Sequence, residues 1–320
     1  MRKGHGQNVD QTVMTKSPDI VALGEALIEF TRLPTQQGKR PTFQQGYGGD
    51  TSNAIIAAAR QGARTGYLSA VGGDPFGEDL IALWAREGVD TSGVQVWPQD
   101  PTGAYFVLPD PVGRKFSYAR RGSAASLFGP EDLDEGLIAQ ARILHVSALS
   151  QAISPTMRAA VTHAAEIARA NDTLVSYDTN LRLNLWTLDE ARRVIEDFLP
   201  LADIVLPSDD EARALTGLAE PIEVLDHFGR FGARYVILKR GAEGPILRSA
   251  EGDVSFAVPI TDAVDSTGAG DSFAGAFLAY LLETDDAETA IRAAMQVAAG
   301  TVSGLGAVDP IPYRATIALD

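Results

Sequence analysis

Short apolar runs alternate along most of the chain with longer segments of helical periodicity, and this alternation limits the possible folds more than any other feature. Apolar residues three or four positions apart, as in 75–87, are typical of a helix with one buried face. The pattern predicts strands at 19–30, 65–71, 142–149, 173–178, 203–206 and 235–238, and helices at 52–61, 75–87, 156–170, 188–198, 271–283 and 287–303. This order predicts an α/β fold whose mainly parallel sheet is covered by helices on both faces.

The region 94–119 interrupts the alternation. It contains short runs such as AYFVL and KFSYA, which are separated by Pro-Asp and Val-Gly turns. Such runs are typical of antiparallel hairpins rather than of strand–helix units. The glycine-rich residues 46–50 (GYGGD) predict a turn before the first helix.

The composition excludes several classes of protein. A chain of 320 residues that is 45% apolar can bury a large core in one domain, and the absence of cysteine suits a cytoplasmic protein without disulfides. Acidic residues outnumber basic residues by 42 to 27, a formal charge of −15, which argues against a nucleic-acid partner. We find neither a membrane-spanning apolar run nor a secretory h-region, and we expect residues 1–18 to form a disordered tail.

Polar residues follow several of the predicted strands. In parallel sheets ligands bind at the carboxyl ends of the strands, so these positions predict the site. They are Glu25, Glu29, and the segments 178–182, 208–211, 239–244 and 265–271.

The strongest functional signal is DSTGAGD, residues 265–271, directly before a predicted helix. Small residues at a helix start leave backbone N–H groups open to an anion, which the helix dipole also favours. A carboxylate beside such a site, here Asp271, is placed to accept a proton from an attacking hydroxyl. The alternative is that Asp271 only caps the helix. The run lacks the Gly-Lys-Ser/Thr of a P-loop, and no G-x-G-x-x-G follows the first strand.

Together with Gly48-Gly49-Asp50-Thr51-Ser52-Asn53, this run resembles the two signatures of the ribokinase-like (PfkB-type) carbohydrate kinases. The resemblance covers nearly the whole chain from residue 19. It implies a three-layer α/β/α kinase domain over 19–320, with a small β lid contributed by roughly 28–47 and 94–120. It also implies an enzyme that transfers the γ-phosphate of ATP to a sugar hydroxyl, with Mg²⁺ as cofactor. The resemblance does not decide whether a monovalent cation such as K⁺ is also bound, or whether the protein forms a homo-oligomer.

The resemblance also implies roles for individual residues. Asp271 would be the general base, and the N–H groups of Gly268, Ala269 and Gly270 would stabilise the transferred phosphoryl group. The residues that would contact the substrate are Gly48, Gly49 and Asn53, and those that would contact the nucleotide are Asn180, Ser208, Lys239, Gly241, Gly244, Gly268 and Gly270. Glu211 would bind magnesium. The family's usual asparagine is replaced by Ser208, and Met295-Gln296 stands where an asparagine often lies near adenine.

Two arginine segments bear on the substrate. They are Tyr118-Ala119-Arg120 and Asp178-Thr179-Asn180-Leu181-Arg182, which resemble the Y-x-R and D-x-N-x-R runs of 2-keto-3-deoxygluconate kinases. On this resemblance Tyr105, Tyr118, Arg120 and Arg182 would contact a sugar acid, because arginine binds carboxylates through paired hydrogen bonds. The phosphate would go to the terminal hydroxyl. The alternatives are that each arginine pairs with one of the many surface acids, that the enzyme is a fructokinase, and that the chain is an inactive sugar- or nucleotide-binding regulator.

Overall fold

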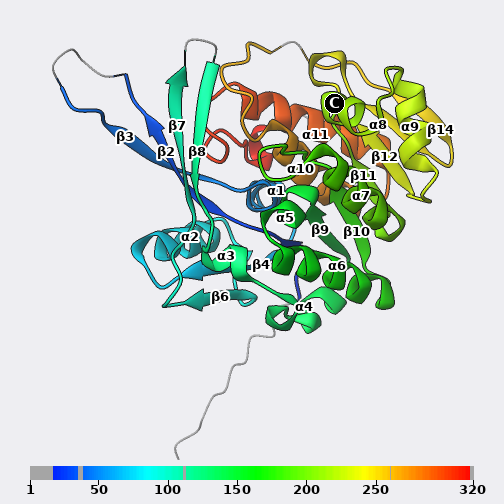
Figure 1. Ribbon diagram of the computed structural model, residues 1–320. Coiled ribbons are helices and arrows are strands. Elements are labelled where there is room, and N and C mark those ends of the chain that lie inside the picture. The colour runs from blue at the N-terminus through cyan, green and yellow to red at the C-terminus, as the bar shows by residue number, and fades with distance from the viewer. Residues whose placement is uncertain (1–16, 35–38, 111–112, 260, 318–320) are drawn as a thin grey trace, which may run out of the picture.

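The computed structural model describes residues 17–34, 39–110, 113–259 and 261–317. Its largest feature is a ten-stranded sheet whose central strands are parallel (Figure 1). In spatial order the strands are β14 (Gly252–Ser255), β13 (Ile246–Ser249), β12 (Tyr235–Leu238), β11 (Ile204–Leu206), β10 (Leu174–Asp178), β9 (Ile143–Ser147), β1 (Ile20–Leu23), β4 (Thr65–Gly72) and β5 (Val89–Asp90), with β6 (Val94–Trp97) also paired to β4. Among the described residues, the antiparallel pairs of this sheet are β12–β13 and β13–β14, at one edge. The predicted fold class is confirmed.

Alternate residues of the strands face two separate cores, because successive side chains of a strand point to opposite faces of a sheet. Ile20 and Ala22 of β1 belong to one core, whereas Val21 and Leu23 belong to the other. The first core is covered by α1 (Asp50–Arg60), α2 (Pro75–Arg86), α10 (Ala269–Thr284) and α11 (Ala287–Val302). The second is covered by α3 (Ala124–Leu127), α4 (Glu135–Gln140), α5 (Ala148–Ile153), α6 (Pro155–Ala170), α7 (Leu188–Phe198), α8 (Asp209–Thr216) and α9 (Pro221–Gly229).

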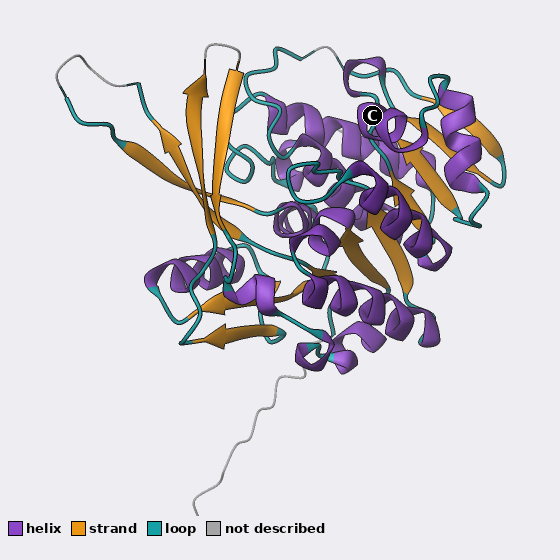
Figure 2. Cartoon of the chain, viewed as in Figure 1, coloured by secondary structure: helices purple, strands orange, loops and turns teal. Residues whose placement is uncertain are grey.

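A second sheet of four strands extends from the body and forms the lid (Figure 2). Its order is β3 (Phe43–Gly48), β2 (Leu27–Arg32), β7 (Ala104–Asp110) and β8 (Gly113–Ala119). The pair β7–β8 is the antiparallel hairpin that the sequence predicted, whereas β2 and β7 run parallel.

Three local predictions were wrong. Residues 19–30 form two strands, since the chain leaves the main sheet after β1 and enters the lid as β2. Residues 46–48, expected in a turn, complete β3. Residues 94–97, expected in the hairpin region of the lid, form β6, which pairs parallel with β4 in the main sheet. The first and third errors concern which sheet a strand joins, because a short apolar run does not encode its partner. The second arises because residues 46–48 pair with β2 in the lid, which glycine-rich composition does not reveal.

The predicted tail, 1–18, lies mostly outside the described residues. At its end Pro18 is buried and the Ser17 hydroxyl donates a hydrogen bond of 2.6 Å to Gln140 Oε1, so these two residues belong to the folded body. Within the described part of the chain, the helices are too short or too polar to span a membrane.

Candidate active site

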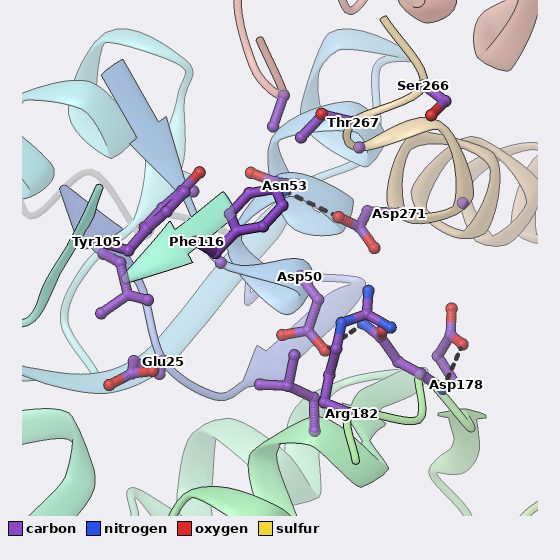
Figure 3. Close-up of a pocket in the computed structure, with 18 of the residues that line it drawn as sticks. Glu25, Asp50, Asn53, Tyr105, Phe116, Asp178, Arg182, Ser266, Thr267 and Asp271 are labelled. Atoms are coloured by element: carbon purple, nitrogen blue, oxygen red, sulfur yellow. Dashed lines mark hydrogen bonds between the residues drawn. The ribbon is translucent and has the colours of Figure 1, made fainter. Parts of the chain in front are cut away.

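A cleft of about 710 Å³ opens between the lid and the carboxyl ends of the main strands. Figure 3 shows that Asp50, Asn53 and Asp271 converge near its middle, with Tyr105 and Phe116 on the lid side. The predicted site residues that line it are Gly48, Gly49, Asn53, Tyr105, Tyr118, Arg120, Asn180, Arg182, Ser208, Glu211, Lys239, Gly268, Gly270 and Asp271. Residues predicted from segments more than 200 positions apart therefore meet in one cavity.

Three predicted residues, Ala269, Gly241 and Gly244, are not among those that line this cleft. Gly244 has a φ of +80°, and a Cβ on it would lie 1.8 Å from the carbonyl oxygen of Phe256. The need for glycine at this position is thus explained by backbone packing.

Gly48 and Gly49 let three segments approach closely at the start of α1. A Cβ on Gly48 would lie 2.5 Å from the Tyr105 hydroxyl oxygen, and one on Gly49 would lie 2.3 Å from the carbonyl oxygen of Glu25. Gly49 also has a φ of +120°, which side-chain-bearing residues rarely adopt. These glycines bring the β1–β2 connection and the lid against the helix that carries Asp50 and Asn53.

We expect Gly49→Ala to destabilise the protein by about 2–4 kcal/mol, because backbone strain and a clash with the Glu25 carbonyl combine. Gly88→Ala is the matched control: its φ is +76°, but a Cβ there has nothing within 4 Å. Strain alone should cost it about 1 kcal/mol. Urea unfolding of both variants measures the difference. Equal losses would contradict the close approach at Gly49.

Asp271 lies in the first turn of α10, directly after the glycine-rich loop. Gly268 caps this helix in the left-handed conformation, with φ of +77°, and a Cβ on it would lie 2.8 Å from the Ala307 carbonyl oxygen. Asn53 Nδ2 donates a hydrogen bond of 2.9 Å to Asp271 Oδ2. The two signature motifs are therefore joined directly through their last residues.

The carboxyl group of Asp271 has a pKa raised to about 7. Desolvation is the main cause, followed by the negative charge of Asp50, while the Asn53 hydrogen bond opposes the shift. A carboxyl group with a pKa near neutrality can both accept and release a proton at physiological pH.

Asp50 is the principal residue that sequence reasoning missed. It is 8% exposed, and its Oδ2 accepts a hydrogen bond of 2.9 Å from Asn180 Nδ2. Its Oδ1 is buried without a hydrogen-bond partner among the described residues, and so is Asn53 Oδ1. A signal was available, since Asp50 is the only acidic residue inside the GGDTSN motif.

Two pairs of oppositely charged side chains lie on the side of the cleft formed by α8 and the ends of β10 and β12. Lys239 Nζ donates to Asp178 Oδ2 at 2.6 Å, and Arg182 Nη1 donates to Glu211 Oε1 at 3.2 Å. Burial alone would lower the pKa of Lys239, but Asp178 and Glu211 outweigh it and raise that pKa. The pKa of Glu211 is raised by burial and by Asp178. Lys239 is therefore charged at neutral pH.

The lid contributes aromatic rings and one buried arginine. Tyr105 and Tyr118 stack with their centroids 5.8 Å apart, and the Arg120 guanidinium lies 5.4 Å from the Tyr118 ring centre. Arg120 Nη2 donates to Glu25 Oε2, and Ser123 Oγ donates to Glu25 Oε1 at 3.3 Å. Burial raises the pKa of Glu25, and the positive charge of Arg120 opposes this rise.

Both arginines thus pair with carboxylates of the protein, although not with those that the alternative interpretation named. Their partners are the cleft residues Glu25 and Glu211 rather than surface acids. Arg120 nevertheless keeps a donor, because its Nε is buried without a partner in the described structure. The lid also holds Glu29, which accepts hydrogen bonds from the hydroxyls of Tyr105 and Thr31.

The start of α10 has no side-chain cap, and the Asp271 carboxyl group beside it has a raised pKa and faces the cleft. This combination is typical of a phosphotransferase site on an α/β fold. Comparison with known proteins agrees. Residues 17–314 match the model of the pfkB family carbohydrate kinases. The chain belongs to this family and is a carbohydrate kinase, an enzyme that transfers a phosphoryl group to a sugar hydroxyl.

Individual relatives fall into more than one substrate class. The chain is 35% identical to the 2-dehydro-3-deoxygluconokinase of Thermoproteus tenax, over 92% of this chain and 91% of that protein. It is 32% identical to the probable fructokinase-4 of Arabidopsis thaliana, over 93% and 95%. The crystal structure of a putative ribokinase II from Escherichia coli, in complex with ATP and Mg²⁺, matches with a TM-score of 0.86 and 28% identity, over 93% of this chain and 97% of that chain.

Proposed function

We propose that the protein is an ATP-dependent kinase that phosphorylates the terminal hydroxyl of 2-keto-3-deoxygluconate. The observation that carries the choice of a sugar acid is Arg120, whose guanidinium borders the cleft beside Tyr118 and whose Nε has no hydrogen-bond partner among the described residues. A substrate carboxylate is the natural acceptor for such a group. The identity to a 2-dehydro-3-deoxygluconokinase supports the same choice.

In this proposal Asp271 accepts the proton of the attacking hydroxyl. Asn53 orients Asp271 through its hydrogen bond, and the N–H groups of Gly268 and Gly270, which line the cleft, stabilise the charge on the transferred phosphoryl group. The Ala269 N–H instead donates a hydrogen bond of 3.3 Å to the Ser266 carbonyl oxygen. Asn180, Ser208 and Lys239 border the cleft on the side where the nucleotide phosphates would lie. Gly241 and Gly244 shape the loop after β12 on that side.

The residues present fit ATP with Mg²⁺. Magnesium is usually bound by one or two carboxylates together with substrate phosphates, and Glu211 offers such a carboxylate in the cleft. Lys239 supplies a positive charge for the phosphates, as nucleotide sites require. Bound Mg²⁺ would neutralise charge that develops on the phosphates.

The test is a coupled ADP-release assay that compares 2-keto-3-deoxygluconate with fructose. We expect kcat/KM at least about 100-fold higher for the keto acid, which equals about 2.7 kcal/mol of transition-state discrimination. A preference for fructose would overturn the proposed substrate and leave the kinase assignment standing.

Fructose is the second candidate because of one observation. The buried carboxylate of Glu25 compensates the charge of Arg120, so this arginine adds no net positive charge to the cleft. A neutral sugar would meet no unfavourable field there. The fructokinase relatives at 32% identity support this candidate.

The pH dependence of the reaction should report the environment of Asp271. We expect kcat/KM to rise as the pH increases through about 7, because only the ionised carboxylate accepts a proton. Asp50→Asn removes a neighbouring negative charge, lowers the pKa of Asp271 and should move this rise to lower pH. Asp189→Asn is the control, since the Asp189 side chain is 96% exposed. An unmoved profile for Asp50→Asn would argue against this coupling.

A further inference from the structure

Arg60 is a buried arginine at the end of α1 that does not line the cleft. Its Nε and Nη2 donate to the two carboxylate oxygens of Glu87, both at 2.9 Å. The two side chains are only 5% and 3% exposed. Burying an ion pair removes both charges from water, and their mutual attraction offsets this desolvation cost only when the geometry is good. A buried pair is therefore weak evidence that its role is to stabilise the fold. Its remaining contacts indicate another role.

The third nitrogen of Arg60 holds the chain near the C-terminus. Nη1 donates to the carbonyl oxygens of Val308 and Ile311 at 2.8 and 2.6 Å. The guanidinium also lies 4.6 Å from the centre of the Tyr313 ring. One side chain therefore connects α1, the end of α2 and the segment 308–313.

The residues just before this segment support the DSTGAGD loop. Gly306 N donates a hydrogen bond of 3.1 Å to Asp265 Oδ2. Ala307 lies directly against Gly268, since a Cβ on that glycine would be 2.8 Å from the Ala307 carbonyl oxygen, and Ala307 lines the cleft. Any shift of Val308 would therefore be transmitted through Ala307 to the start of α10.

Helix α1 also contacts the DSTGAGD loop directly, in addition to the connection through Arg60 and the segment 306–308. Asn53 lies about two turns before Arg60 and bonds Asp271 at the other end of the DSTGAGD run. We propose that Arg60 is a positioning residue, which sets the segment 306–308 against residues 265–268 and so fixes the phosphate side of the cleft relative to Asn53. The inference rests on the proposed role of the backbone N–H groups at the start of α10 in binding the transferred phosphoryl group of the nucleotide.

The test uses Arg60→Lys, which keeps a positive charge beside Glu87. A single ammonium group cannot bond both carboxylate oxygens and two separate carbonyls as the planar guanidinium does. We expect ATP affinity, measured with a fluorescent ATP analogue in the absence of sugar, to fall about tenfold, and kcat to fall by a similar factor. The KM for the sugar should change less than about twofold, because residues 48–53 and the lid are not displaced.

Arg314→Met is the matched control. Arg314 holds the same C-terminal segment by two hydrogen bonds to Glu283, at 2.7 and 2.8 Å, and by one of 3.3 Å to the Gln61 carbonyl oxygen. None of its hydrogen bonds within the described part of the chain reaches residues 306–311. We expect this variant to lower the melting temperature without changing ATP affinity. Glu87→Gln is a second variant, which should weaken ATP binding in the same direction as Arg60→Lys and by a smaller factor.

Two results would overturn the inference. If Arg60→Lys and Glu87→Gln fold and keep wild-type ATP affinity, Arg60 is only a stabilising residue. A wild-type protein that does not bind ATP would remove the proposed function and the inference together. A different preferred sugar would affect only the proposed substrate, because ATP binding is measured without it.

Discussion

Asp271→Asn should reduce kcat by about 10²–10⁴-fold, the usual scale for the loss of a general base. The substitution keeps the size of the side chain, and the amide oxygen can still accept the hydrogen bond from Asn53 Nδ2. We therefore expect the KM values for sugar and ATP to change little. Steady-state kinetics above pH 8, where the wild-type carboxyl group is ionised, gives the cleanest comparison.

Asp189→Asn serves as the control for a change of one charge, since its side chain is almost fully exposed. It should keep wild-type kcat. If Asp271→Asn retains wild-type turnover, the general-base role is wrong and Asp271 acts only in capping α10, the alternative that the sequence left open.

Arg120→Met should affect both stability and specificity. It leaves the Glu25 carboxylate, 1% exposed, without its charged partner, and breaking a buried pair costs about 3–5 kcal/mol. Glu25→Gln should also destabilise, because it leaves the guanidinium unpaired. In the double variant neither charge is stranded, so we expect most of the stability to return. Urea unfolding of the four proteins measures the coupling.

Activity measurements on the same variants distinguish the role of Arg120 in pairing with Glu25 from a role in binding the substrate carboxylate. If Arg120 binds the substrate carboxylate, the stable double variant should still lose about 100-fold in kcat/KM for the keto acid, with the KM for ATP unchanged. Arg121→Met is the matched control, because Arg121 is the adjacent residue and is exposed. Full activity of the double variant toward the keto acid would show that Arg120 only pairs with Glu25.

The ion pair between Arg120 and Glu25 is one of several in a cleft that is rich in carboxylates. The protein carries a formal charge of −15, and its cleft contains Glu25, Asp50, Asp178, Glu211 and Asp271. Arginines and a lysine compensate several of these carboxylates locally. A sugar acid would therefore be bound by directed hydrogen bonds rather than by a general positive field.

Local sequence determined most of the elements and both signature motifs. Strand–helix alternation is a periodic property of neighbouring residues, so it predicted the main sheet and the helices around it. The glycines of the two motifs are required by local backbone geometry and close packing, as Gly49 and Gly268 show. Requirements of this kind are visible in the sequence because only glycine meets them.

The tertiary structure alone decided which distant groups meet. Residues 94–97 joined the main sheet rather than the lid, and the run 19–30 was divided between the two sheets. Glu25 pairs with Arg120 across 95 positions, and Arg60 bonds Val308 across 248. Such pairings depend on the path of the whole chain. The identity of a Glu or an Arg in the sequence does not show whether its charged group meets water or a buried partner.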